Sequence, residues 1–308
     1  MIIVFGSLNI DVVMPVGHFP KPGETVLCAA DYLSRPGGKG ANQALAAARA
    51  GAKVAMVGMV GDDSFGRRCV NNLKHQGVMV SGVAISERPT GCATIAVDMQ
   101  GENFVIVAPG ANLDAKSDQA PDEIFTPKNI ILTQMEVTPQ ETFSVLARAR
   151  GRGAVTILNP SPAGKLPPET LKSVDYLIVN EVEVLQLAHH LGIAGAAPAL
   201  LAKAIARFGN LACIVTLGDK GSVAARKDVL FAVSSLPAEV VDTTGAGDTF
   251  CGVFAASLQA GHDWLKALHR ASVGAGLSCL GLGAQDGMPL REDIEKNLAK
   301  VAPPHKIG

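Results

Sequence analysis

A glycine-rich segment at residues 242–250 carries the clearest chemical signal in the sequence. It reads Asp-Thr-Thr-Gly-Ala-Gly-Asp-Thr-Phe and runs into an apolar stretch that predicts a helix. Gly245, Ala246 and Gly247 at the helix start leave backbone N–H groups unpaired under little side-chain bulk, which favours an anion. Asp248 adds a carboxylate there, which suits a reaction in which a hydroxyl loses its proton as it attacks phosphorus. Alternatively, Asp248 only complements the helix dipole.

A second glycine cluster lies at residues 36–43, which read Pro-Gly-Gly-Lys-Gly-Ala-Asn-Gln. Three glycines in four residues allow the backbone to approach a ligand closely, and Lys39 and Asn42 offer donors to hydroxyl groups. An ordinary helix start remains an alternative. The segment is not a Walker A loop, and no G-x-G-x-x-G follows the first predicted strand, so a dinucleotide-dependent oxidoreductase is disfavoured.

A third element reads Asn-Glu-Val-Glu at residues 180–183. Asn180 and Glu183 are three residues apart and can face the same way at a helix start. A carboxylate here could order the water around Mg²⁺, which usually keeps several waters and binds through substrate phosphates. A capping box, in which the two side chains satisfy only the helix end, is the alternative.

The elements that must position these groups follow a β-α-β pattern. Short apolar runs alternate with helical stretches, which predicts a mainly parallel sheet covered by helices on both faces. The predicted strands are residues 2–5, 53–60, 130–133, 155–158, 176–179, 213–216 and 239–241, and the helices are 41–50, 63–76, 139–150, 181–191 and 198–208. Ligands bind such sheets beyond the carboxyl ends of the strands. The polar residues that follow the strands are Asn9, Asp11, Gln134, Glu136, Asn159, Asn180, Glu183 and Thr216.

A second, smaller sheet is predicted from alternating polarity at residues 11–16, 25–33, 92–98 and 103–107. Residues 99–102 read Met-Gln-Gly-Glu and predict a hairpin between the last two strands. We expect this mostly antiparallel sheet to cover a site as a lid or to form a dimer surface.

Composition excludes several classes of function. The 308 residues carry 27 basic and 28 acidic side chains, a net charge of -1 that offers no field for nucleic acid. No apolar run reaches the length of a membrane span, and the start of the chain does not resemble a leader peptide, so we expect a cytoplasmic protein without a membrane partner. The six cysteines include no C-x-x-C pair, and we expect most to be small buried side chains.

Together the three motifs resemble the PfkB-type carbohydrate kinases. The similarity runs in order from Gly-Ser-Leu-Asn-Ile-Asp at residues 6–11 to Gly-Ala-Gln at residues 283–285, nearly the full length. The resemblance implies a three-layer α/β/α sandwich formed by a single catalytic domain over residues 1–308. It also implies lid strands at roughly residues 11–34 and 91–108, a homodimer formed through the lid, and transfer of the ATP γ-phosphate to a sugar hydroxyl.

Within this family, the motifs are most similar to those of members that phosphorylate ribose. The resemblance implies that the sugar is held by Asn9, Asp11, Gly38, Lys39, Asn42 and Glu136, with Asp248 as base for the 5-hydroxyl. It places Gly245, Ala246 and Gly247 around the transferring phosphate. The implied nucleotide site comprises Asn180, Thr216, Leu217, Gly218, Asp219, Lys220, Gly221, Gly247 and Ser272, and Glu183 would lie near a hydrated Mg²⁺.

The resemblance also implies a monovalent cation, usually K⁺, beside the anion site. The matching positions are Asp242, Thr244, Ser278, Gly281, Gly283 and Gly287, mostly through backbone carbonyls. Where these relatives typically read Gly-Ala-Gln-Pro-Ser, residues 283–287 read Gly-Ala-Gln-Asp-Gly. One candidate hydroxyl ligand is therefore missing at Gly287.

Two other functions remain open at this stage. A relative acting on a nucleoside or another sugar would share the phosphate machinery. A non-catalytic sugar sensor on the same scaffold is a different class of function. The intact Asp248 and glycine segment argue against a sensor, because a sensor has no use for a base.

Overall fold

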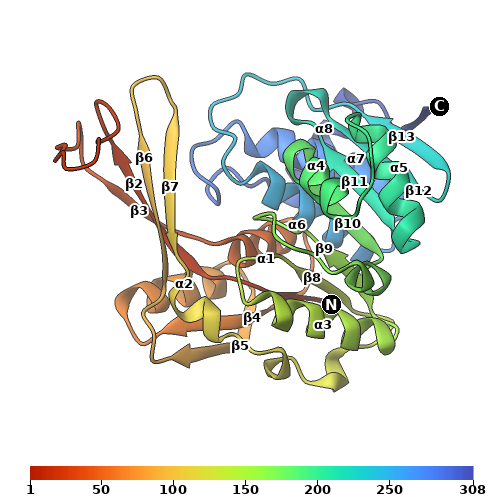
Figure 1. Cartoon of the computed structure of the whole chain (residues 1–308), viewed down its shortest axis with the longest axis horizontal. Coiled ribbons are helices and arrows are strands. Elements are labelled where there is room, and N and C mark those ends of the chain that lie inside the picture. Colours follow the sequence, from red (N-terminus) through yellow and green to blue (C-terminus); the bar gives the residue numbers. More distant parts are fainter. Residues whose placement is uncertain (308) are drawn as a thin grey trace.

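A ten-stranded sheet runs through the molecule in the order β14-β13-β12-β11-β10-β9-β8-β1-β4-β5, as the computed structural model of residues 1–307 shows (Figure 1). The part of the sheet that runs β11-β10-β9-β8-β1-β4-β5 is parallel throughout. Strands β12, β13 and β14 continue the sheet by antiparallel pairing. The strands are β1 (Ile2–Phe5), β4 (Val54–Gly61), β5 (Met79–Ser86), β8 (Ile130–Thr133), β9 (Val155–Leu158), β10 (Tyr176–Asn180), β11 (Ala212–Thr216), β12 (Ser222–Arg226), β13 (Val229–Val233) and β14 (His305–Ile307).

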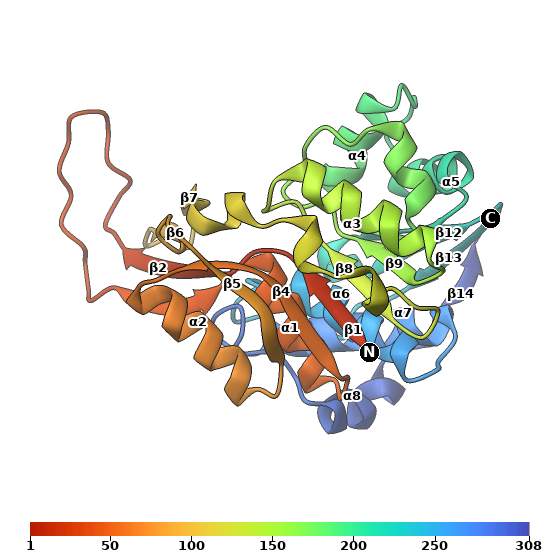
Figure 2. The ribbon, with the colours of Figure 1, turned by 90° about the horizontal axis from the view of Figure 1, so that it is seen from below.

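Helices cover both faces of this sheet, because its central strands are apolar on both sides. In β1, Ile2 and Val4 belong to a core cluster shared with α1, α2, α6, α7 and α8, whereas Ile3 and Phe5 pack with α3. Helices α4 and α5 join α3 on that second face (Figure 2). The helices are α1 (Lys39–Arg49), α2 (Ser64–His75), α3 (Pro139–Gly151), α4 (Glu181–His190), α5 (Pro198–Gly209), α6 (Ala246–Gln259), α7 (Trp264–Ser278) and α8 (Arg291–Asn297).

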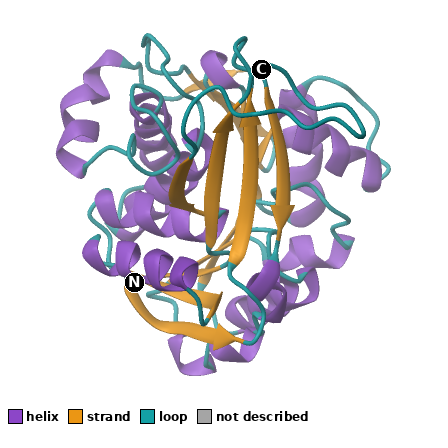
Figure 3. Cartoon of the chain, turned by 90° about the vertical axis from the view of Figure 1, so that its left-hand side faces the viewer, coloured by secondary structure: helices purple, strands orange, loops and turns teal. Residues whose placement is uncertain are grey.

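A separate four-stranded sheet, called the small sheet below, extends from one side of the molecule and faces the viewer in Figure 3. Its order is β3-β2-β6-β7, with β2 (Asn9–Pro15), β3 (Leu33–Gly37), β6 (Gly91–Val97) and β7 (Asn103–Ala108). The β6–β7 hairpin is antiparallel, as predicted, and so is the β2–β3 pair, while β2 and β6 run parallel. The α/β architecture with a mainly parallel sheet and a small second sheet is therefore confirmed.

Some predicted elements are wrong. The strand predicted at residues 25–33 is mostly an exposed loop, with a single bridge between Val16 and Cys28, because its apolar positions have no face to bury against. The strand of the small sheet is instead Leu33–Gly37, whose last two residues begin the glycine cluster at 36–43. Residues 239–241 are also exposed and form no strand.

Four strands were not predicted. Strand β5 is one edge of the sheet, and β14, from the end of the chain, is the other; the β12–β13 hairpin lies between β14 and β11. The hairpin turns at Lys227, which has a φ of 55°, without the asparagine–glycine signature that marks such turns. Of the six cysteines, Cys69, Cys213 and Cys251 are buried, whereas Cys28 is exposed.

Candidate active site

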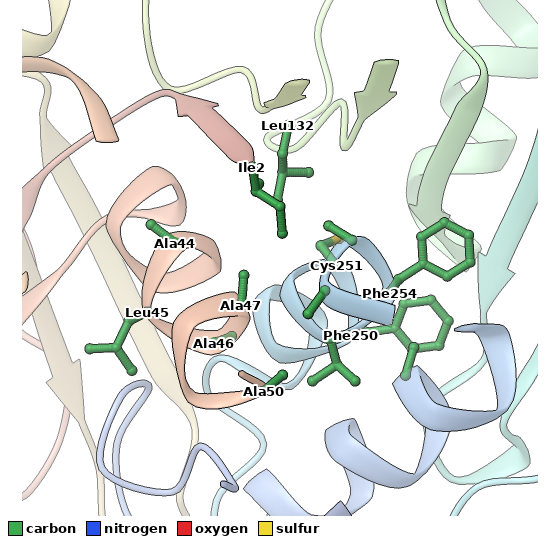
Figure 4. Packing of buried hydrophobic residues seen from close by; sticks show 14 of the residues in the cluster. Ile2, Ala44, Leu45, Ala46, Ala47, Ala50, Leu132, Phe250, Cys251 and Phe254 are labelled. Carbon is green, nitrogen blue, oxygen red and sulfur yellow. The ribbon is translucent and has the colours of Figure 1, made fainter. Parts of the chain in front are cut away.

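Two glycine-started helices, α1 and α6, pack against each other (Figure 4). A hydrogen bond from Asn42 to Asp248 joins their first turns. The contact is close because α1 is alanine-rich and α6 has a glycine at the crossing. A Cβ added at Gly252 would lie 2.6 Å from the Cβ of Ala46 and 2.7 Å from the backbone oxygen of Gln43. Small residues at this crossing therefore set the separation between the two predicted motifs.

A cavity of about 220 Å³ opens where these helix starts meet the carboxyl ends of β9, β10 and β11. Its lining residues are Lys39, Asn159, Ser161, Ile178, Val179, Asn180, Glu183, Thr216, Gly245, Gly247, Asp248 and Cys251. The cavity lies at the strand ends where ligands are expected in a parallel sheet. All three predicted motifs contribute to it.

Asp248 is 7% exposed, and an amide group holds each of its carboxylate oxygens. Asn42 donates from Nδ2 to Oδ2 at 2.9 Å, and Gln43 donates from Nε2 to Oδ1 at 3.0 Å. Gln43 is itself fixed, because it accepts from Gln134 Nε2 at 2.6 Å and also donates to Asn159 Oδ1 at 3.1 Å. The carboxylate is thus oriented while it keeps lone pairs free to accept a proton.

The start of α6 offers backbone donors directly beside this carboxylate. Gly245 is the N-cap, with a φ of 78°, and no side chain caps the helix. A Cβ at Gly245 would meet the backbone oxygen of Ala284 at 2.6 Å, whereas one at Gly247 would meet nothing within 4 Å. Within residues 1–307, the amides of Gly247 and Asp248 have no hydrogen-bond partner. Two free N–H groups at a helix N-terminus have the donors and the dipole that favour an anion, as the sequence predicts.

Polar residues from the small sheet and from the segments that follow β1 and β8 approach the start of α1. Glu136 Oε2 accepts from Ser7 Oγ at 2.6 Å and from the backbone N–H of Lys39 at 2.9 Å. Asn9 Oδ1 accepts from Asn112 Nδ2 at 2.7 Å. Sequence reasoning missed Asn112, because it lies in a short 3-10 segment without any motif.

Asp11 is the least paired carboxylate of this group. Burial, together with the negative charges of Glu136 and Asp248, raises its pKa to about 7, against the opposing effect of Lys39. Its carboxylate lies against Gly37, where an added Cβ would come within 2.1 Å of Oδ2. A half-buried carboxylate with spare acceptor capacity suits a ligand rich in hydroxyl groups.

Lys39 brings a positive charge to the same place. Burial lowers the pKa of its ammonium group, but the carboxylates of Asp248, Glu136 and Glu183 outweigh burial, so the pKa is raised. Gly38, just before it, has a φ of 89°, and a Cβ there would meet the backbone nitrogen of Asn9 at 2.8 Å. The close approach of β2 to the start of α1 therefore requires glycine at position 38.

Asn180 and Glu183 form a capping box at the start of α4, which was the structural alternative to a role near Mg²⁺. Asn180 N donates to Glu183 Oε2 at 2.9 Å, and Glu183 N donates to Asn180 Oδ1 at 2.8 Å. Both residues also line the cavity, so capping does not remove them from the site. Residues 1–307 contain no cluster of three His, Cys, Asp or Glu side chains that could hold a metal ion.

The remaining residues predicted for the nucleotide divide into two groups. Thr216 lines the cavity at the end of β11. Leu217, Gly218, Asp219, Lys220 and Gly221 form the turn that follows it, outside the lining residues. Ser272 is 4% exposed and donates to the backbone oxygen of Ser234 at 2.8 Å, so its hydroxyl serves the fold.

The residues predicted for a monovalent cation converge on the loop after α7. Asp242 Oδ1 accepts from Thr244 N and Oδ2 from Gly283 N, both at 2.8 Å. A Cβ at Gly281 would lie 2.8 Å from Cα of Gly287, and one at Gly287 would lie 2.4 Å from the backbone oxygen of Ser278. The oxygen-rich set has the chemistry of a K⁺ site, but a side chain cannot enter at position 287 unless the loop moves.

None of the helices within residues 1–307 has the length and apolarity needed to cross a membrane.

Comparison with known proteins agrees with this geometry. The chain is 39% identical to a ribokinase of Bacillus subtilis over 303 residues, which covers 97% of this chain and 99% of the relative. The solved structure of a ribokinase from Thermotoga maritima matches with a TM-score of 0.88 at 33% identity, covering 97% of this chain and 99% of that one.

A ribokinase of Arabidopsis thaliana, solved in complex with ribose and ATP, matches with a TM-score of 0.87 at 31% identity and covers 96% of this chain and 98% of that one. The pfkB family carbohydrate kinase profile matches residues 1–291. With the anion site and the buried carboxylate in place, the chain belongs to the PfkB family of carbohydrate kinases, which are ATP-dependent phosphotransferases.

Proposed function

We propose that this kinase transfers the γ-phosphate of ATP to the 5-hydroxyl of ribose, with Asp248 as the general base. The observation that carries the proposal is the position of Asp248. Its carboxylate is fixed by Asn42 and Gln43 next to the two free amides that begin α6. A hydroxyl between the carboxylate and the anion site would lose its proton to Asp248 while it attacks phosphorus.

The proposed sugar site is the polar region between the small sheet and the start of α1. Asp11, Asn9 and Glu136 supply acceptors for sugar hydroxyls, and Lys39 and Asn42 supply donors. Asp11 and Glu136 lie near enough to each other to raise the pKa of Asp11, as expected for carboxylates that share one small site. Hydroxyl groups of a sugar would occupy the acceptor sites that these carboxylates leave open.

The proposed nucleotide site is the part of the cavity that Asn180, Thr216 and Gly247 line. The transferring phosphate would accept hydrogen bonds from the amides of Gly247 and Asp248 and lie within reach of the Lys39 ammonium group. Bound Mg²⁺ would neutralise phosphate charge, and Glu183, at 7% exposure, could hold one of its water ligands. Because phosphoryl transfer has a loose transition state, this charge stabilisation matters at least as much as proton removal.

We further propose that the chain is one catalytic domain in which the small sheet acts as a lid and as a dimer surface. All six residues of β7 are exposed, among them Phe104, Val105, Ile106 and Val107, and the strand is an edge of its sheet. An unpaired apolar edge strand favours association with another strand. A second copy of the same sheet would cover it.

A related kinase activity on a nucleoside or another sugar is the second candidate, since the anion site and Asp248 would serve any primary hydroxyl. The test is ADP release with MgATP over a panel of pentoses, hexoses and nucleosides. Ribose should give the highest kcat/KM. A higher value with a nucleoside would move the assignment to that substrate, and tight binding of sugar and ATP without any ADP release would indicate a sensor.

A further inference from the structure

Two arginines hold the loop that follows α7, and they come from opposite sides. Arg49 of α1 donates from NH1 to the backbone oxygens of Gln285 at 2.7 Å and Met288 at 2.9 Å. Arg35 of β3 donates from NH1 to the backbone oxygen of Leu282 at 3.1 Å. The loop is therefore joined both to the helix that carries Asn42 and to the small sheet.

Arg35 reaches the part of the loop where the cation was expected. Its guanidinium pairs with Asp286 Oδ2 at 3.0 Å, and a Cβ added at Gly283 would lie only 2.2 Å from its NH1 atom. Gly283 N is the group that donates to Asp242 Oδ2. A fixed positive charge thus lies against the same backbone that also presents the candidate cation ligands.

Two departures from the ribose-phosphorylating relatives occur together in this loop. Asp286 stands at their proline position and gives Arg35 its ionic partner. Gly287 stands at their serine position, and the backbone oxygen of Ser278 occupies the space that a side chain would need. One change anchors a guanidinium beside the candidate cation ligands, and the other removes one candidate hydroxyl ligand, so the loop lacks part of the cation site that the resemblance implies and carries a positive group against the rest.

We propose that the guanidinium of Arg35 supplies the positive charge that a monovalent cation supplies in these relatives, so that this kinase does not depend on K⁺. This inference rests on the proposed phosphoryl transfer beside Asp248. It also links two sites, because Arg35 and Asp11 are register partners on β3 and β2. The charge reaches the loop only when the small sheet lies against it.

The test compares the wild type with Arg35→Ala in KCl and in tetramethylammonium chloride at equal ionic strength. Arg68→Ala is the matched control: Arg68 binds Ser34 on the same strand, through Oγ and the backbone oxygen, both at 2.8 Å. ADP release with ribose and MgATP should change less than about twofold with K⁺ in the wild type and the control. Arg35→Ala should lose about tenfold without K⁺, or roughly 1.4 kcal/mol of barrier, and recover when K⁺ is added.

A second readout does not require catalysis. The unfolding temperature of Arg35→Ala should rise specifically with K⁺, because the emptied space can then take the cation, whereas that of the wild type should not. A strong K⁺ requirement or a K⁺-specific rise in the wild type would overturn the proposal, as would an Arg35→Ala variant as indifferent to K⁺ as the wild type. Absence of ADP release with every sugar would instead reject the proposed function, and the unfolding temperatures would still decide the role of Arg35.

Discussion

The start of α6 and the small sheet face the same site but are built in opposite ways. Asp248 sits on a helix that is buried from Asp248 to Ser257, and amides from α1 fix both of its oxygens. Asp11 and Arg35 sit on strands with little covering, and Asp11 lacks such fixed partners. The α1–α6 pair therefore holds the Asp248 carboxylate rigidly. On the small sheet, Asp11 is left to pair with a ligand, and Arg35 pairs with the loop after α7.

Of the substitutions that leave Asp248 itself unchanged, the removal of the Gln43 side chain, which holds Asp248 in place, should have the largest effect on catalysis. Gln43→Ala leaves Asp248 Oδ1, Asn159 and Gln134 each short of a partner, which costs roughly 1–3 kcal/mol for a buried group. We expect kcat to fall about 10- to 100-fold with a smaller change in the KM for the sugar.

The control is Gln259→Ala at the far end of α6, where the side chain bonds only to the backbone of Lys53. It should leave kcat unchanged. A Gln43→Ala enzyme within twofold of the wild type would show that Asp248 does not depend on this amide.

Gly252→Ala tests the helix crossing that holds the two motifs together. The new methyl group would lie within 3 Å of Ala46, Gln43 and Ala47, so α1 and α6 must separate at a cost of about 1–3 kcal/mol. Urea unfolding measures this loss. Gly151→Ala, whose methyl would meet nothing within 4 Å, should be neutral or slightly stabilising, and equal losses in both variants would refute the crossing argument.

Asp11→Asn tests the role of the small sheet through the pH dependence of the protein's stability. The folded-state pKa of Asp11, about 7, lies above its usual value of 3.8, so the folded state disfavours the ionised form. The penalty is absent below pH 4, develops between pH 4 and 7, and is complete above pH 7. Asp11→Asn should therefore stabilise the protein more at pH 8 than at pH 5, by roughly 2–3 kcal/mol in urea unfolding, while sugar binding weakens. An identical stability change at both pH values would contradict this.

Ile106→Lys should have the smallest effect on the fold, because the side chain is 60% exposed on the edge strand β7. It places a charge in the proposed dimer surface and should shift the protein from dimer to monomer in sedimentation velocity, with an unchanged unfolding temperature at low concentration. Leu200→Lys, at a 63% exposed position on α5, is the control and should remain dimeric. A wild type that sediments as a monomer would reject the dimer.

The sequence predicted most of the central sheet, because buried strands and amphipathic helices have distinct periods. The sequence pattern was misleading at residues 25–33, where polarity alternates but the residues are mostly exposed. It also did not reveal short edge strands such as β14. Edge strands are specified by the neighbour that they pair with, which a local pattern does not contain.

The three motifs were found because glycine at a helix start leaves a local mark. The contacts between the motifs leave no such mark in the sequence, because the residues that meet are far apart in the chain: Asn42 and Asp248 are separated by 206 residues. Gln43 was not assigned a role, because an amide inside a helix carries no signature until its partner is known. The same reason hid Asn112 and the pairing of Arg35 with Asp286.

The most direct test of the central claim is the single-turnover rate of phosphoryl transfer in Asp248→Asn, with the binding of ribose and ATP measured on the same preparation. Asparagine keeps the size of the side chain but is a much weaker base. The rate should fall by about 10²- to 10⁴-fold, the usual contribution of a general base, while both ligands still bind. A near-normal rate would show that Asp248 is not the base.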